Sequence, residues 1–392
     1  MAEYKINDFG AVPDGTTLNT EAIQKAIDEC HSAGGGRVVC GVGCYKTGSV
    51  MLKSNVELHL ETGCTLLGSE KLDDYVDLTS SGFINNADKT AENSSRALIN
   101  AVNSENVAVT GQGRLDGNGL FFYKPGDIGP TGKFNKPSTQ RPRIVMFYGC
   151  RDVRFEDITC VDSSCWTFWL MKCEDVNIRG VKIRCNKKMV NVDGIDIDAC
   201  RNVVVSDCII DTEDDCIAVR SIQNMYETPA VCENITVTNC VLKTECNGVR
   251  IGCPSDAVIR NCVFSNLVID GYSGIAVQNP RIYLSEGSIG CADIYNISFA
   301  NITVKCSHYP VQIYVEEGVR LKRLSDFSFS NFTVKSGGPY IIQGSSETII
   351  KKVRFSNMQI ETAGKDVFVC RNCEEISFNG IEFSNLSDSG KK

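Results

Sequence analysis

The chain has 392 residues, of which 42% are hydrophobic and 22% are charged, and its formal net charge is −8 at pH 7. This composition argues against nucleic acid or an anionic membrane as the main partner, and no run approaches the roughly 18 apolar residues of a membrane-spanning helix. Its only histidines, His31, His59 and His308, are too scattered to suggest a metal site. The sequence predicts neither a metal ion nor a cofactor.

The first predicted element in chain order is an amphipathic helix within residues 17–36. One helical face carries its apolar residues, Ala22, Ile23, Ala26, Ile27 and Cys30. Asn19 or Thr20 can serve as N-cap, and glycines 34–36 can end the helix. Such a helix is expected to cover one open end of a hydrophobic core.

An internal repeat begins after this helix and continues to about residue 383. Each copy starts with Asn or Asp in most cases and continues as two apolar alternations of period two, separated by Asn, Asp or Gly. The copies start at Asn106, Asp152, Asp175, Asn202, Asn234, Asp256, Asn296, Asp326, Lys352 and Glu375, with a related copy at Asn55. Intervals such as 23, 27 and 22 residues are too short for helical crossovers, so the repeat predicts an all-β parallel solenoid. We expect one domain over residues 1–392, with a flexible tail at 384–392.

Many of the 21 cysteines fall at fixed positions of this repeat. One set lies two residues before a repeat start and comprises Cys150, Cys173, Cys200, Cys232 and Cys373. Another lies six residues after a start and comprises Cys208, Cys240 and Cys262. We interpret these residues as small buried side chains stacked in ladders, although stacked cysteines are also close enough for disulfide bonds.

Three intervals of the repeat are stretched, at residues 114–142, 221–230 and 279–292. The first contains four of the ten prolines in the chain. Long loops of a solenoid can build walls around a binding site, so these segments predict a cleft.

Two acidic segments lie between the stretched loops. NVDGIDID contains Asp193, and DTEDDCIAV contains the adjacent pair Asp214 and Asp215. In a parallel solenoid, residues one coil apart in sequence become neighbours at about 4.8 Å. These carboxylates are therefore expected to lie together on adjacent coils, although each could also simply cap a turn.

The chain resembles glycoside hydrolase family 28, the polygalacturonase family, in FGAVPDG near its start, GQGRLDGNG, WTFWL and the two acidic segments, in this order. This resemblance implies a single-stranded right-handed parallel β-helix and hydrolysis with inversion. It also implies that Asp214 is the general acid and that Asp193 and Asp215 hold and deprotonate the attacking water, with Asn191 beside them. Such a reaction needs an acid and a base about 6.5–9.5 Å apart on opposite sides of the sugar.

The chain departs from the family pattern where the substrate is recognised. Asn247 stands where the family has a histidine, and Ala276, Val277 and Gln278 stand where it has the Arg-Ile-Lys segment that binds a uronate carboxylate. An alanine and a glutamine do not replace that charge. Nearby candidates for substrate binding are Arg220, Glu245 and Arg250, although the arginines could also serve only structural ion pairs.

We therefore expect an inverting, exo-acting glycosidase that cleaves pectin-type oligosaccharides or a related glycoside, with a specificity unlike that of ordinary polygalacturonases. Two alternatives remain open: a catalytically inactive glycan-binding β-helix and a β-eliminating polysaccharide lyase. The odd number of cysteines and the absence of an apolar leader indicate a cytoplasmic protein, or a secreted one if a leader has been removed.

Overall fold

A computed structural model describes residues 2–80, 94–284 and 291–385 of the chain. The chain divides into two compact units, which are described separately. The first comprises residues 1–196 and 200–213, and the second comprises residues 197–199 and 214–392. Whether they form one domain, as the repeat suggests, stays a prediction, and the predicted tail lies mostly outside the described residues. Within the described part of the chain, no helix is long and apolar enough to cross a membrane.

The first unit consists of parallel strands stacked coil upon coil, preceded by one α-helix. Strand β17 (Ile195–Asp198) contributes residues to both units. The other strands of this unit are β1 (Glu3–Lys5), β2 (Asp14–Leu18), β3 (Gly36–Cys40), β4 (Gly43–Thr47), β5 (Val50–Leu52), β6 (Val56–Leu60), β7 (Cys64–Gly68), β8 (Ala97–Val102), β9 (Glu105–Gly111), β10 (Arg114–Asp116), β11 (Arg143–Tyr148), β12 (Arg151–Glu156), β13 (Thr159–Val161), β14 (Phe168–Met171), β15 (Glu174–Arg179), β16 (Lys182–Arg184), β18 (Arg201–Ser206) and β19 (Ile209–Thr212). Successive coils pair in parallel register, so that Val153, Val176 and Val203 stack in the core. These coils confirm the predicted parallel solenoid.

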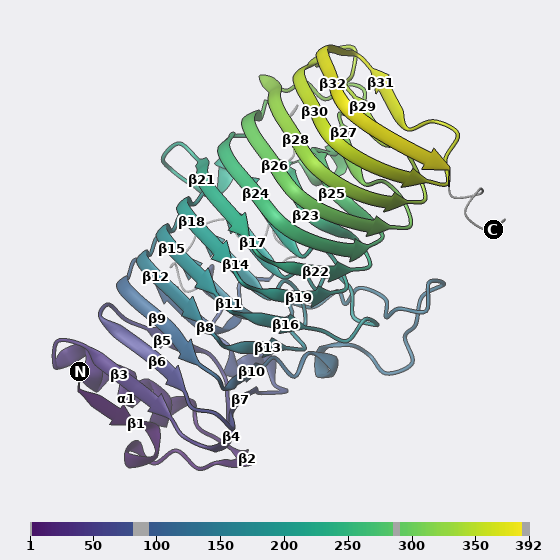
Figure 1. Cartoon of the computed structure of the whole chain (residues 1–392). Coiled ribbons are helices and arrows are strands. Elements are labelled where there is room, and N and C mark those ends of the chain that lie inside the picture. Colours follow the sequence, from purple (N-terminus) through teal and green to yellow (C-terminus); the bar gives the residue numbers. More distant parts are fainter. Residues whose placement is uncertain (1, 81–93, 285–290, 386–392) are drawn as a thin grey trace. The chain divides into compact units, whose positions relative to one another are not determined.

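The predicted N-terminal helix is α1 (Thr20–Ser32), and it packs against β1, β3 and β5 (Figure 1). Its buried residues are Ile23, Ala26, Ile27 and Cys30, as the apolar periodicity predicts. Asn19 occupies the N-cap position, but its side chain makes no capping bond and instead binds the backbone of Val12. At the other end, Gly35 N–H donates to Cys30 O and Gly34 N–H donates to His31 O, the bond pattern with which glycine commonly ends a helix.

The stretched segment after β10 packs against the residues that precede Asp193. The Tyr123 hydroxyl contacts the carbonyl oxygens of Ser164 and Val190 at 2.8 and 2.9 Å, and Phe134 N–H donates to Lys188 O at 2.8 Å. Tyr123 also packs with Met189 and Val192 in a buried cluster. This first stretched loop therefore borders the segment that carries Asp193.

Arg143, on β11, is a buried cation that lies against two tryptophan rings. Its guanidinium carbon lies 4.6 Å from the ring centroid of Trp166 and 4.7 Å from that of Trp169. Only 1% of Arg143 is exposed. Because the guanidinium is buried and lies against both rings, this arrangement is expected to contribute about 2 kcal/mol or more to stability.

The second unit continues the same construction with longer strands. Its strands, apart from its share of β17, are β20 (Ile217–Ser221), β21 (Val231–Thr238), β22 (Val241–Thr244), β23 (Asn247–Ser255), β24 (Val258–Gly271), β25 (Ser273–Gln278), β26 (Asp293–Cys306), β27 (Val311–Tyr314), β28 (Arg323–Ser336), β29 (Tyr340–Gln343), β30 (Ile350–Thr362), β31 (Phe368–Arg371) and β32 (Cys373–Asn385). Strands β24, β26, β28, β30 and β32 lie side by side (Figure 1). A row of stacked phenyl rings, Phe264, Phe299, Phe329, Phe355 and Phe378, follows their register at centroid spacings of 4.8 to 5.4 Å, and all but Phe378 are buried.

The Asn and Asp residues of the repeat occupy left-handed turns. In the second unit, the side chains of Asn239, Asn266, Asn301, Asn331 and Asn357 form a hydrogen-bonded ladder from coil to coil. Positive φ angles of 52–57° at these residues explain the preference for asparagine.

One predicted repeat start is wrong. The residue that follows Asn234 in its ladder is Asn261, whose side-chain amide donates to Asn234 Oδ1 at 3.2 Å, and not Asp256. Asp256 belongs to the preceding turn, where it accepts from Gln223 N–H. Cys262 consequently pairs in register with Ile235 and does not extend the ladder of Cys240.

The cysteines are packing residues for the most part. All 21 are free thiols, and only Cys291 and Cys370 are exposed. In the first unit, Cys150, Cys173 and Cys200 are buried one coil apart, and Cys173 N–H contacts Cys200 Sγ at 3.3 Å. The interpretation as small buried side chains is confirmed for the repeat cysteines except Cys373, which is half-buried.

Candidate active site

The acidic pair Asp214 and Asp215 lies in the turn that precedes β20 in the second unit. Asp215 is 3% exposed, and its Oδ1 accepts a 2.7 Å hydrogen bond from the Asn247 side-chain amide. Asp214 is half-buried, and its Oδ1 accepts from Asp215 N–H at 2.9 Å. The Thr244 hydroxyl donates to the Asp214 carbonyl at 2.5 Å. The two carboxylates therefore differ in environment, since one is enclosed and the other is accessible.

Arg250, on β23, supplies the positive charge beside this pair. Its Nη1 lies 3.7 Å from Asp215 Oδ2, and the side chains of these two residues are only 14% and 4% exposed. Burial alone would lower the pKa of Arg250, but the negative charge of Asp215 and the other neighbouring groups together outweigh it and hold that pKa above its ordinary value. Arg250 is therefore charged near neutral pH.

Cys246 is a residue of this site that the sequence analysis did not identify. Its sulfur accepts from the Asn247 amide at 3.2 Å, and its own N–H donates to Thr244 Oγ1 at 2.9 Å. Burial, followed by the charges of Asp215 and Asp214, raises the pKa of the Cys246 thiol far above its ordinary value. The only signal in the sequence was its position directly before Asn247.

The ligand atoms of Asp214, Asp215 and Cys246 all lie within 4.8 Å of one another, a spacing that a metal ion could use. The Arg250 guanidinium already lies beside Asp215. We assign the positive charge of this site to Arg250.

A row of amide side chains extends from Arg250 across the next strands. Arg250 Nη2 donates to Gln278 Oε1 at 3.4 Å and contacts Cys253 Sγ at 2.9 Å. The Gln278 amide, on β25, in turn donates to Gln312 Oε1 on β27. Ala276 is fully buried beside Arg250 in the strand register. Gln312 was not among the predicted site residues, and it joins the site because its strand lies next to β25.

The remaining predicted residues of the second unit have different surroundings. Glu245 is exposed in the turn between β22 and β23, whereas Asn247 two residues later is buried against Asp215. Arg220, on β20, is 4% exposed, and its charge acts on the Cys253 thiol together with that of Arg250. The structure thus brings together Asp214, Asp215, Asn247, Arg250 and Gln278.

Asn191 and Asp193 belong to the first unit. Asn191 adopts a left-handed conformation with φ of 59°, and Asp193 is 2% exposed. The N–H and hydroxyl of Thr167 both donate to the Asp193 carbonyl, at 2.9 and 2.8 Å. These bonds fix the backbone that carries the Asp193 side chain. The joint action of Asp193 with Asp214 and Asp215 stays a prediction.

Comparisons with known proteins place this site in a family. Residues 52–380 match the model of glycosyl hydrolases family 28. The chain is 26% identical to the exo-poly-alpha-D-galacturonosidase of Dickeya chrysanthemi, over 97% of this chain and 71% of that protein. It is 30% identical to a probable polygalacturonase of Vitis vinifera, over 55% of this chain but only 43% of that protein.

Solved structures show the same architecture. The hyperthermoactive exopolygalacturonase of Thermotoga maritima superposes with a TM-score of 0.74 at 23% identity, covering 97% of this chain and 92% of that one. The polygalacturonase of Erwinia carotovora gives a TM-score of 0.68 at 17% identity, with 98% and 96% covered. These likenesses confirm the predicted right-handed parallel β-helix. The family match and the polygalacturonase relatives establish that the chain is a glycosidase belonging to glycosyl hydrolases family 28.

Proposed function

We propose that the protein hydrolyses a glycosidic bond with inversion, with Asp214 as the general acid and Asp193 and Asp215 as the residues that hold and deprotonate water. The observation that carries this proposal is the contrast within the acidic pair. Asp215 is buried and held by Asn247 and Arg250, whereas Asp214 is accessible.

This contrast fits the two tasks of a single displacement. An acid must approach the leaving oxygen of the substrate, so it has to be accessible, as Asp214 is. A carboxylate that orients water benefits from a fixed position, which the 2.7 Å bond from Asn247 gives to Asp215. In this role Asp215 acts as an anion, and the adjacent charge of Arg250 favours that form.

We further propose that the substrate is a pectin-type oligosaccharide or a related glycoside, attacked from a chain end. The printed names of two similar proteins, an exo-poly-alpha-D-galacturonosidase and an exopolygalacturonase, support the pectin class and the exo mode. Substrate recognition beside the acids would use Arg250, Gln278, Gln312 and Asn247. Amide groups offer both donors and acceptors to sugar hydroxyls, so we expect a neutral or deoxy sugar to be accepted at this subsite.

A panel of defined oligosaccharides tests both parts of the proposal. Oligogalacturonides and oligosaccharides that alternate uronate with a deoxy sugar are incubated with the enzyme after fluorescent labelling at the reducing end, and neutral aryl glycosides are assayed by release of the aryl alcohol. Exo attack releases one sugar at a time from the unlabelled end, so the labelled products shorten in steps of one. Release of internal fragments from the start would contradict the exo mode, and a strict preference for oligogalacturonides would contradict the neutral subsite.

A pair of variants tests the acid assignment. Asp214→Asn removes the proton donor and is expected to lower the hydrolytic rate by about 10²-fold or more. Asp270→Asn is the matched control, because the Asp270 side chain is 56% exposed on β24 and pairs with Lys305 at 3.6 Å. If Asp214→Asn retained the full rate, the assignment would be wrong. If the wild-type protein bound these oligosaccharides but cleaved none, the glycan-binding alternative would replace hydrolysis.

A further inference from the structure

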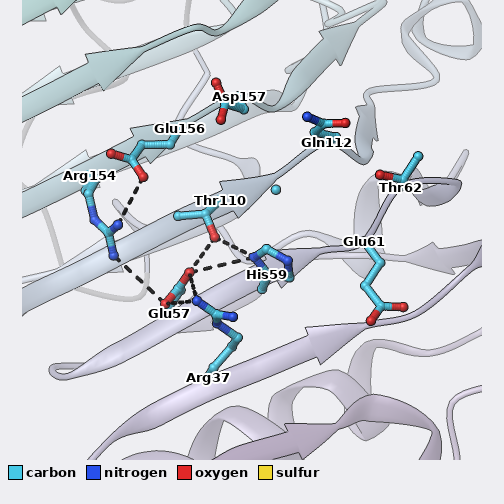
Figure 2. A pocket seen from close by; sticks show the side chains of 11 residues that line it. Arg37, Glu57, His59, Glu61, Thr62, Thr110, Gln112, Arg154, Glu156 and Asp157 are labelled. Carbon is cyan, nitrogen blue, oxygen red and sulfur yellow. Dashed lines mark hydrogen bonds and ion pairs between the residues drawn. The ribbon is translucent and has the colours of Figure 1, made fainter. Parts of the chain in front are cut away.

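A polar hollow lies in the first unit, apart from the candidate active-site residues. It is on the face of strands β3, β6, β9 and β12 that points away from the core. Figure 2 shows its side chains, and its volume is about 610 Å³, within the usual range of ligand pockets. On β6, Leu58 and Leu60 enter the core, so Glu57 and His59 occupy the opposite face. Glu57 and Thr110 are nevertheless only 6% and 4% exposed. Outward-facing residues with so little exposure lie at the bottom of a concave surface.

The floor of the hollow is a prearranged charge network centred on Glu57. Arg37 approaches its carboxylate to 3.2 Å, Arg154 approaches it to 3.9 Å, and Thr110 donates a 2.5 Å hydrogen bond (Figure 2). Burial alone would raise the pKa of Glu57, but the bonds from Thr110 and Arg37 outweigh it and hold that pKa below its ordinary value. His59 Nδ1 contacts Thr110 Oγ1 at 2.7 Å and extends the network toward the rim.

The strand register explains why this place is hollow. Glu57 pairs with Ala108, and Ala108 pairs with Arg154. A methyl group therefore separates two long side chains on the same outward row. Gly111, at the end of β9, adds a position without a side chain beside His59.

The rim offers hydrogen-bonding groups that the floor does not use. Glu61, Thr62 and Gln112 line the hollow and are exposed. In the described part of the chain, the side chains of Thr62 and Gln112 make no hydrogen bond of their own. Carboxylate, hydroxyl and amide groups together offer donors and acceptors in one place.

The residues that line the hollow indicate which kind of ligand it can bind. It contains no aliphatic or phenyl side chain in the described residues, so an apolar ligand would gain little there. Its two guanidinium groups face four carboxylates, those of Glu57, Glu61, Glu156 and Asp157, so the lining is net negative. An anionic sugar or a phosphate is repelled by this balance. A neutral, hydroxyl-rich molecule matches both the donors and the acceptors without a charge to desolvate.

We propose that this hollow is a binding site for a neutral sugar unit. Its lining shares no residue with the proposed hydrolytic site and offers different chemical groups. The family of the chain makes carbohydrate the relevant class of hydroxyl-rich ligand. The site would hold a neutral part of an oligosaccharide and leaves the hydrolytic step to the acidic residues described above.

A matched pair of sugars and a matched pair of variants test this proposal. Methyl α-galactopyranoside and methyl α-galactopyranosiduronate differ only in the carboxylate at C6, and spermidine serves as a cationic probe. Binding is measured by isothermal titration, and hydrogen exchange read by mass spectrometry locates it. The neutral sugar is expected to bind saturably and to protect residues 56–62 and 105–112.

Gln112→Ala is expected to weaken this binding by about tenfold, since it removes one set of ligand bonds. Gln359→Ala, an exposed glutamine on β30, is the control and should leave binding unchanged. The hydrolytic rate at saturating substrate should be unchanged in both variants, which separates this site from the hydrolytic one. The proposal is overturned if the neutral sugar protects neither segment, if Gln112→Ala binds it as wild type does, or if the uronate or spermidine binds there more tightly.

Discussion

The buried pair of Arg250 and Asp215 should contribute more to stability than a closer ion pair on the surface. Arg250 Nη1 and Asp215 Oδ2 are 3.7 Å apart with side-chain exposures of 14% and 4%. At an effective dielectric constant of about 20, charges at this distance attract by roughly 4–5 kcal/mol. Removing one partner of a buried pair also leaves the other charge without compensation, at a cost of about 3–5 kcal/mol. Arg250→Ala should therefore lower the free energy of unfolding by about 3 kcal/mol or more.

The chain offers a control ion pair whose charged atoms are closer together than those of Arg250 and Asp215 but whose side chains are more exposed to solvent. Arg260 and Glu233 approach to 2.7 Å, but the Arg260 side chain is 38% exposed. Arg260→Ala should cost at most about 1 kcal/mol, because solvent screens an exposed pair. Arg250→Lys should fall between the two, since it keeps the charge but loses the contacts with Cys253 and Gln278.

The assay is urea denaturation at pH 7, followed by far-ultraviolet circular dichroism, for the wild type and the three variants. The same preparations are assayed for hydrolysis, and Arg250→Ala should be slower than wild type because Asp215 loses a group that fixes it. If Arg250→Ala destabilised the protein no more than Arg260→Ala, burial would not govern the strength of this pair, and the role given to Arg250 would be refuted.

Three further predictions concern other parts of the chain. Asp293 binds Arg323 through both carboxylate oxygens at 2.7 and 3.1 Å. Burial alone would raise the pKa of Asp293, but these bonds hold it below its ordinary value, so their stabilisation is present near neutral pH and is lost as the pH falls through the lowered pKa. Asp293→Asn should therefore cost about 1 kcal/mol at pH 7 and progressively less in acid, as read from denaturation midpoints, and an undiminished difference in acid would contradict this linkage. Arg143→Ala should lower the unfolding free energy by about 3 kcal/mol in urea denaturation, because Arg143 is 1% exposed and lies against two tryptophan rings, and a loss below about 1 kcal/mol would contradict that role. Titration with a thiol reagent should rapidly modify Cys291 and Cys370, the exposed cysteines, and the buried thiols should react only after denaturation. Fast reaction of many thiols in the native protein would contradict the packing described here.

The fold was predictable because the repeat controls it at every coil. Alternating apolar residues and left-handed Asn or Asp turns recur at intervals that a parallel β-helix requires, and Asn234, Asn296 and Asn301 all occupy such turns. The one misplaced start, Asp256, shows the limit of this pattern. Asp256 is followed by the same apolar alternation as Asn261, and the two are distinguished by contacts of the folded chain, such as the hydrogen bond between Asn261 and Asn234.

The candidate site was predictable in its residue types and less so in its contacts. Asn247 and Arg250 were identified from their positions relative to a family pattern, and both contact Asp215. Cys246 and Gln312 were missed, because a thiol before an asparagine and a glutamine on a later strand carry no signal of their own. Strand register brings Gln312 beside Gln278, and that register is a property of the fold rather than of any short motif.

The stereochemistry of the first product tests the central claim most directly. Proton NMR spectra recorded during the first minutes of cleavage, on an oligosaccharide chosen from the panel, reveal which anomer appears before mutarotation. Hydrolysis by a single displacement at Asp193, Asp214 and Asp215 predicts that the first product has the anomeric configuration opposite to that of the bond cleaved, and that Asp214→Asn forms it far more slowly. A product that retained the configuration of the substrate, or an unsaturated sugar formed by elimination, would contradict this account.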